Sequence, residues 1–241
     1  MPEPNATVAE IRAFMDRFRG FAAARSQIRL NQFRAGFGQL QQGLKRLNAA
    51  RLQVEREEAP RHNIFSILGV AAHENRTHTP MLAYLLNPRA THGQGCLFLR
   101  EFLSQCGRMD GFPQPTGDVE SGAWFVDTQK VTASGTMDLV ISSPSLRYLL
   151  VVENKIYAPE GADQVMRHHR WLESRRVQYE RRALIFLTPE GREASSAPRS
   201  DYFPMSYRQD VQAMLRLALP SVEAPGVRET VRQYLAIIES L

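Results

Sequence analysis

The chain shows two patterns of hydrophobic positions, and the change between them falls near residue 60. Before it, apolar residues recur at alternating spacings of three and four, first from Ile11 to Phe21 and again from Leu30 to Leu47. This spacing lines them up along one side of a helix. Residues 6–58 also contain no proline, so we expect one or two amphipathic helices in this segment.

An apolar stripe of this length needs a surface to pack on. The alternatives are packing of two helices on each other, on the rest of the chain, or on a second subunit. A free-standing long coiled coil is less favoured, because four glycines weaken the helix and Arg25 and Arg51 interrupt the stripe. Each glycine costs up to about 1 kcal/mol of helix stability relative to alanine.

After Pro60 the apolar residues occur in short runs separated by loops rich in glycine and proline. Runs with the period of a strand are expected at 123–133, 136–143, 147–155, 183–188 and 202–207. Runs with the period of a helix are expected at 80–86, 96–106, 161–178, 207–219 and 226–240. The nearly continuous apolar run at 183–188 is typical of a strand buried on both faces, and Pro204 limits the last strand to a sheet edge.

This order of elements is typical of an α/β protein in which helices cover a sheet. We therefore expect a basic, amphipathic helical extension over residues 1–60 and one α/β domain over residues 61–241. The two cysteines cannot form a disulfide scaffold or a four-thiolate metal site. No run of 18 apolar residues and no secretory signal are present, so we expect a cytoplasmic protein without a membrane span.

The positive charge of the chain is concentrated in the helical extension. The net charge is +5, and the stretch between Arg17 and Val54 holds eight basic residues and no acidic one. A basic helix of this kind suits a polyanionic partner, although a solvated helix face has the same composition. The candidate nucleic-acid contacts are Arg25, Arg29, Arg34, Lys45 and Arg46.

The segment from Asp138 to Lys155 carries the clearest chemistry. Glu153 and Lys155 are two residues apart at the end of an apolar strand, so their side chains point to the same side. If the two strands form a hairpin, Asp138 joins them. An ion pair at the end of a hairpin would explain the three residues. A divalent cation held by the two carboxylates would explain them as well, because Mg²⁺ prefers oxygen ligands.

The surrounding sequence resembles the PD-(D/E)XK nuclease superfamily. The resemblance lies in the frame TMDLVI…LLVVENKIYA, in HENRTHTPMLAYLLNP and HGQGCLFLREFL before it, and in Gln164 and ALIFLTPEG after it. It implies a restriction-endonuclease-like core, a mixed sheet of about four strands flanked by helices. It also implies Asp138 and Glu153 as ligands of Mg²⁺ or Mn²⁺ and Lys155 as the catalytic lysine.

The same resemblance assigns roles to further residues. Gln164 stands where related nucleases begin a Q-x-x-x-Y element, and His168 replaces the tyrosine of that element. Met137 replaces the proline that usually precedes the first aspartate. Glu74 is a candidate third acidic group at the metal, with helix capping as the alternative.

Three more residues are candidates for the cleft. His78 lies four residues after Glu74 and would share its helix face, although a buried core histidine would have the same spacing. His92 precedes a helix and could face a phosphate. Tyr157 could pack beside Lys155 or simply close the end of the strand.

These features favour a metal-dependent endonuclease that hydrolyses DNA phosphodiester bonds, in restriction, defence or repair. The alternative is a non-catalytic nucleic-acid-binding or assembly protein that retains the fold. The expected partners are DNA and, through the N-terminal helices, a second copy of the chain.

Overall fold

The computed structural model describes residues 4–241, with side chains described from residue 8 onward. The chain divides into two compact units, residues 1–62 and 63–241. The boundary that we expect from the sequence, after residue 60, lies two residues earlier than this division.

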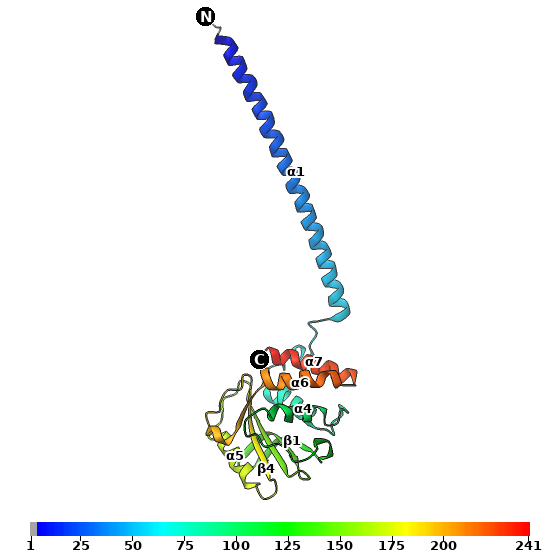
Figure 1. Ribbon diagram of the computed structural model, residues 1–241, viewed down its shortest axis with the longest axis vertical. Coiled ribbons are helices and arrows are strands. Elements are labelled where there is room, and N and C mark those ends of the chain that lie inside the picture. Colours follow the sequence, from blue (N-terminus) through cyan, green and yellow to red (C-terminus); the bar gives the residue numbers. More distant parts are fainter. Residues whose placement is uncertain (1–3) are drawn as a thin grey trace. The chain divides into compact units, whose positions relative to one another are not determined.

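The first unit is one helix, α1 (Pro4–Glu58), which runs without a break through all four glycines (Figure 1). Of the alternatives of one or two helices, the structure therefore has one. The apolar side chains of its stripe are exposed, from Ile11 to Val54. Among the described residues of this unit, no second helix covers them.

The second unit is built on a mixed sheet of five strands in the order β1-β2-β3-β4-β5. The pairs β1–β2 and β2–β3 are antiparallel, and the pairs β3–β4 and β4–β5 are parallel. The resemblance implied about four strands, and the alternation of apolar residues indicated the five that are found. Their bounds are β1 (Phe125–Thr132), β2 (Gly135–Ser143), β3 (Tyr148–Asn154), β4 (Arg181–Thr188) and β5 (Phe203–Ser206).

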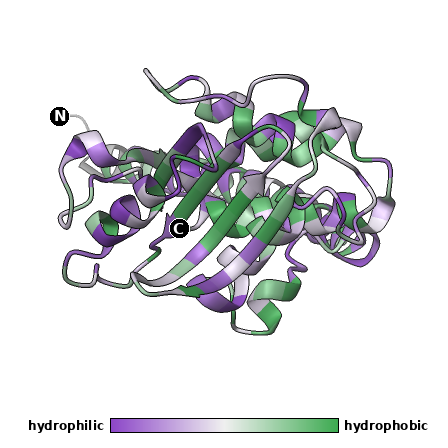
Figure 2. Cartoon of the chain, turned by 90° about the horizontal axis from the view of Figure 1, so that it is seen from below, coloured by the Kyte–Doolittle hydropathy of each residue, from purple (hydrophilic) through white to green (hydrophobic). Residues whose placement is uncertain are grey.

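Strands β3 and β4 form the centre of this sheet because their side chains are apolar on both faces. All seven residues of β3 are buried, and six of the eight residues of β4 are buried as well. Figure 2 shows the middle strands of the sheet coloured as hydrophobic. Pro204 lies in the edge strand β5, as its missing N–H requires.

Helices cover both faces of the sheet and enclose two separate cores (Figure 1). Leu150 and Val152 of β3 point into the larger core, which contains side chains of α3, α4, α6 and α7. Leu149 and Val151 point to the other face, where α5 covers the smaller core. The bounds of these helices are α3 (Thr79–Leu86), α4 (Leu97–Cys106), α5 (Gln164–Ser174), α6 (Gln212–Ala218) and α7 (Pro225–Glu239).

Short helical segments connect these elements. One of them, η1, is a π-helical turn directly before α3, and it contains Glu74 and His78. The bounds of these segments are α2 (Ile64–Ile67), η1 (Glu74–His78), η2 (Val119–Ser121), η3 (Arg199–Asp201), η4 (Tyr207–Val211) and η5 (Leu219–Ser221). No described helix combines the length and the apolar character needed to cross a membrane.

Candidate active site

Three carboxylates from separate segments surround the ammonium group of Lys155. Lys155 Nζ lies 2.7 Å from Glu153 Oε1, 3.6 Å from Glu74 Oε1 and 3.9 Å from Asp138 Oδ2. Asp138 and Lys155 are each 7% exposed and Glu153 is fully buried. The structure thus brings together the strand residues and the acidic residue of η1 that the sequence analysis singled out.

The end of β3 holds two of these carboxylates through its backbone. Pairing between β2 and β3 ends at Leu139 and Val152. The backbone N–H groups of Asn154 and Ile156, which follow this pair, therefore have no partner in β2. Asn154 N donates to Asp138 Oδ2 at 2.9 Å, and Ile156 N donates to Glu74 Oε2 at 2.9 Å. Hydrogen bonds of this kind fix the orientation of a carboxylate and favour its charged form.

The cluster holds more negative than positive charge. Burial, and then repulsion by Glu153, raises the pKa of Asp138 from 3.8 to about 6. Burial alone would lower the pKa of Lys155, but attraction by Glu153, Asp138 and Glu74 raises it above its usual value. Lys155 is therefore charged at neutral pH, while Asp138 resists ionisation.

Helix α5 and the loop before it orient Glu153 from the opposite side. Gln164 accepts a hydrogen bond from Gly161 N with its Oε1, so its Nε2 faces Glu153 Oε1, at 2.5 Å. His168 is one turn further along the helix, and its Nδ1 lies 3.1 Å from Glu153 Oε2. His168 thus occupies, beside Glu153, the place where the Q-x-x-x-Y element would have a tyrosine.

His78 does not lie with Glu74 in this cluster. In the π-helical turn Glu74 reaches Lys155 and Ile156, while His78 is fully buried in the larger core. Its Nε2 contacts the Ala71 carbonyl at 2.9 Å and its Nδ1 contacts the Tyr234 hydroxyl at 3.2 Å. Burial lowers the pKa of His78 to about 4, so it is neutral at physiological pH. These are the contacts of a buried core histidine, which was the alternative to a cleft residue that its spacing left open.

His92 and Tyr157 also lie apart from the carboxylates. His92 is buried, with its Nε2 3.0 Å from the Asn87 carbonyl and its Nδ1 accepting from Gln94 N at 2.9 Å. Both ring nitrogens therefore contact backbone atoms of the loop before α4. Tyr157 is 66% exposed, and its hydroxyl donates to the Leu241 carbonyl at 3.4 Å.

The candidate DNA contacts on α1 are in the other unit. Their side chains are exposed on the helix surface, which is the state that contact with phosphates requires. They are Arg25, Arg29, Arg34, Lys45 and Arg46.

Several groups that hold the site together could not be predicted from the sequence pattern. Gln129 donates from Nε2 to Asp138 Oδ1 at 3.0 Å. The amides of Asn154 and Ile156 act through the backbone, so their side chains give no signal in the sequence. The one signal that was available is the position of Gln129 in the strand that neighbours Asp138.

The chemistry of this cluster fits a divalent cation. Its donors are carboxylate oxygens, which Mg²⁺ and Mn²⁺ prefer. Glu153 Oε2 is buried and lacks a hydrogen bond of good geometry, so it has lone pairs left for a metal. Within residues 4–241, no three acidic, histidine or cysteine side chains are already arranged around one metal position. The Lys155 ammonium instead lies among the three carboxylates.

Comparison with known proteins agrees with this geometry. Residues 62–236 match the model of a family described as the PD-(D/E)XK nuclease superfamily. No curated protein and no solved structure matches the chain. The matched residues cover most of the chain and include the four charged residues of the cluster. The resemblance seen in the sequence is thereby confirmed, and the chain belongs to the PD-(D/E)XK nuclease superfamily.

Proposed function

We propose that this protein is a nuclease that hydrolyses DNA phosphodiester bonds with the help of Mg²⁺ or Mn²⁺. The observation that carries the proposal is the position of Lys155 Nζ within 4 Å of carboxylates from η1, β2 and β3. A hairpin ion pair would need one carboxylate. A second, buried carboxylate and a third, half-buried one cost free energy unless a bound cation offsets their repulsion.

Each of the four charged residues of the cluster has its own role in this proposal. Asp138 and Glu153 hold the cation, and Glu74 completes the acidic side of the site. The cation, when bound, supplies Lewis-acid activation of a water molecule and of the phosphate. Lys155 is charged at neutral pH, so it stabilises the negative charge that develops on the phosphate oxygens.

Gln164 and His168 support this arrangement through Glu153. Their nitrogen atoms lie against different oxygens of the Glu153 carboxylate, at 2.5 Å and 3.1 Å. Gln164 thus holds one oxygen by a hydrogen bond, while the other oxygen lies beside His168 without one and stays available to a cation. Partners of this kind typically change metal affinity or activity by about 10- to 100-fold when they are removed.

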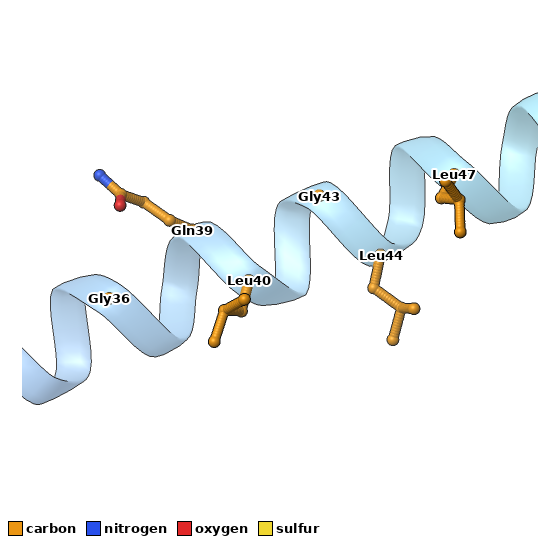
Figure 3. A pocket seen from close by; sticks show the side chains of 6 residues that line it. All are labelled: Gly36, Gln39, Leu40, Gly43, Leu44 and Leu47. Atoms are coloured by element: carbon orange, nitrogen blue, oxygen red, sulfur yellow. The ribbon is translucent and has the colours of Figure 1, made fainter.

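For helix α1 we propose two linked roles, DNA contact and association with a second copy. The exposed basic side chains supply positive charge for phosphates. Leu40, Leu44 and Leu47 point to one side of the helix, and Gly36 and Gly43 lie nearby without side chains (Figure 3). An exposed stripe of this length is typical of an interface, and its spacing is that of a coiled coil.

The place of action that we propose is the cytoplasm, in restriction, defence or repair. Cys96 and Cys106 are both buried free thiols, as in proteins of reducing compartments. Burial raises the pKa of each thiol, so neither is a reactive nucleophile.

The deciding experiment is incubation of the full-length protein with supercoiled plasmid, linear duplex and single-stranded DNA. Each substrate is tested with Mg²⁺, with Mn²⁺ and with EDTA, beside the Asp138→Asn variant. We expect cleavage that needs a metal and is lost in the variant. Binding of DNA without cleavage in either metal would instead support a non-catalytic nucleic-acid-binding protein.

A further inference from the structure

Gln129 departs from the regular geometry of β1. Its φ is +50°, in the left-handed region that residues with a side chain rarely adopt. The positions on both sides of it are paired with β2, Thr128 with Leu139 and Lys130 with Met137. The described chain has three other non-glycine residues with positive φ, and all of them lie outside the strands.

This conformation aims the amide of Gln129 at the acidic cluster. Its Nε2 lies 3.0 Å from Asp138 Oδ1 and 3.5 Å from Asn75 Oδ1. Asn75 is the residue after Glu74, so one side chain connects β1 with both β2 and η1. Gln129 is itself exposed, and burial of its side chain therefore does not explain why the strained backbone is kept.

The contact completes the support of Asp138. Asn154 N donates to Oδ2, and Gln129 donates to Oδ1, so each oxygen of the carboxylate has a donor of its own. Rotation of the carboxylate would break both hydrogen bonds. Removing Gln129 leaves Asp138 held at one oxygen and free to turn.

We propose that Gln129 is a positioning residue, which fixes the Asp138 carboxylate and links it to the Glu74 segment, and that its left-handed backbone is strain kept for this purpose. This inference rests on the proposed function of Asp138 as a metal ligand. The competing explanation is a local irregularity of the β1–β2 pair that has no effect on the site.

Two variants separate the strain from the contact. Gln129→Ala removes the amide and keeps the strained conformation, whereas Gln129→Gly removes the amide and relieves it. We expect the glycine variant to melt about 2–4 °C above the alanine variant without metal, the reverse of the usual order in a strand. In calorimetric titration with Mn²⁺ alone, both variants should bind about 10- to 100-fold more weakly than the wild type.

Arg147 supplies a matched control. It has a φ of +48° and lies in the turn between β2 and β3, away from the acidic cluster. Arg147→Gly should likewise be more stable than Arg147→Ala, and both should bind Mn²⁺ and cleave DNA as the wild type does.

Each outcome decides between the two explanations. Wild-type Mn²⁺ affinity in Gln129→Gly would overturn the positioning role, and a less stable glycine variant would overturn the strain. If the wild type itself binds no metal, the proposed function fails instead. The contact is then judged by a double-mutant cycle of Gln129→Ala with Asp138→Ala, in which each single variant removes the hydrogen bond, measured by denaturant unfolding without metal. Additive effects in that cycle would overturn the coupling as well.

Discussion

Asn154 donates its backbone N–H to the side chain of Asp138, at 2.9 Å, just beyond the last residue pair of the β2–β3 ladder. The carboxylate thus takes the place that a backbone carbonyl of β2 would have if the β2–β3 pairing continued past Leu139 and Val152. The backbone of the sheet therefore sets the orientation of Asp138. The same strand end supplies Glu153 and Lys155, so one short segment determines most of the geometry of the site.

Replacing Lys155 by alanine should affect both activity and stability. We expect Lys155→Ala to lower cleavage by about two to four orders of magnitude, because the charge on the phosphate loses its stabilisation. We also expect a loss of stability, because Lys155 is buried among three carboxylates and breaking a buried pair typically costs about 3–5 kcal/mol.

Lys130 is the matched control for this experiment. Its ion pair with Asp127 is exposed, so Lys130→Ala should change the free energy of unfolding by less than about 1 kcal/mol. Plasmid cleavage and urea unfolding without metal are the two measurements. Cleavage by Lys155→Ala at the wild-type rate would remove Lys155 from the mechanism.

Asp138 should make the metal-free protein less stable as the pH rises. Its pKa is about 6 in the folded protein against 3.8 for an ordinary aspartate, so its contribution is fully present below pH 3.8 and is lost as the pH passes 6. The loss amounts to about 3 kcal/mol. Asp138→Asn should abolish this pH dependence, as measured by urea unfolding between pH 4 and pH 8.

Variants of the two proposed metal ligands should also bind metal more weakly. Asp138→Asn and Glu153→Gln each remove one negative charge with little change in shape. We expect calorimetric titration with Mn²⁺ to show reduced affinity in both. Unchanged affinity in both variants would mean that the cluster is an ion pair and not a metal site.

His168 and its neighbour His169 offer a comparison of two histidines on one helix. His168 faces Glu153, whereas His169 Nδ1 lies 2.8 Å from the Asp201 carbonyl. His168→Ala should weaken Mn²⁺ binding by about 10- to 100-fold, and His169→Ala should leave it unchanged. Equal Mn²⁺ affinities in the two variants would show that His168 only fills space.

Glu160 should protect the fold against acid. It accepts hydrogen bonds from Ser195 N and Ser196 N and pairs with Arg192, which ties the loop after β3 to the loop after β4. Burial alone would raise the pKa of Glu160, but these donors lower it to about 2. The stabilisation is therefore present above the ordinary pKa of 4.5 and is lost as the pH falls towards 2.

The variant Glu160→Gln tests this assignment. We expect it to lower the Tm at pH 7 and to show a smaller deficit at pH 3, by differential scanning calorimetry. Glu190→Gln is the control, because its pair with Arg208 is exposed and contributes little. A Tm deficit of Glu160→Gln that does not change with pH would contradict the lowered pKa.

Removal of α1 should weaken DNA binding and reduce its dependence on salt. Each phosphate that a basic side chain neutralises contributes about 0.9 to the slope of log K against log salt for duplex DNA. Residues 63–241, which form a compact unit, should therefore give a shallower slope than the full chain. Light scattering should show a smaller number of subunits per particle. If slope and subunit number both stay unchanged, α1 serves neither role.

Much of the fold followed from the sequence because most elements have a clear hydrophobic period. All five expected strands are present, and β2 and β3 lie within one residue of the expected ranges. Asp138, Glu153 and Lys155 could be placed together because a hairpin and a period of two fix their relation. Glu74 needed the family resemblance, since it reaches the site from a segment 82 residues before Ile156.

The remaining features depend on tertiary contacts that no local pattern shows. The left-handed conformation of Gln129 is unfavourable for a glutamine by itself and is seen only in the folded sheet. The π-helical turn that separates His78 from Glu74 also has no signature in the spacing of the two residues. The glycines of α1 suggested a break, but their cost is spread over 55 helical residues and does not interrupt the helix.

The sheet has its strands in the same order as the sequence, and this has a consequence for how the molecule forms. Each strand pairs with the one made before it, so the sheet grows by local steps and needs no strand inserted between two others. Asp138, Glu153 and Lys155 meet as soon as the β2–β3 hairpin closes. Glu74 lies 82 residues before Ile156, whose backbone N–H binds it. Its contact with the cluster therefore closes the longest loop of chain among the contacts of the site.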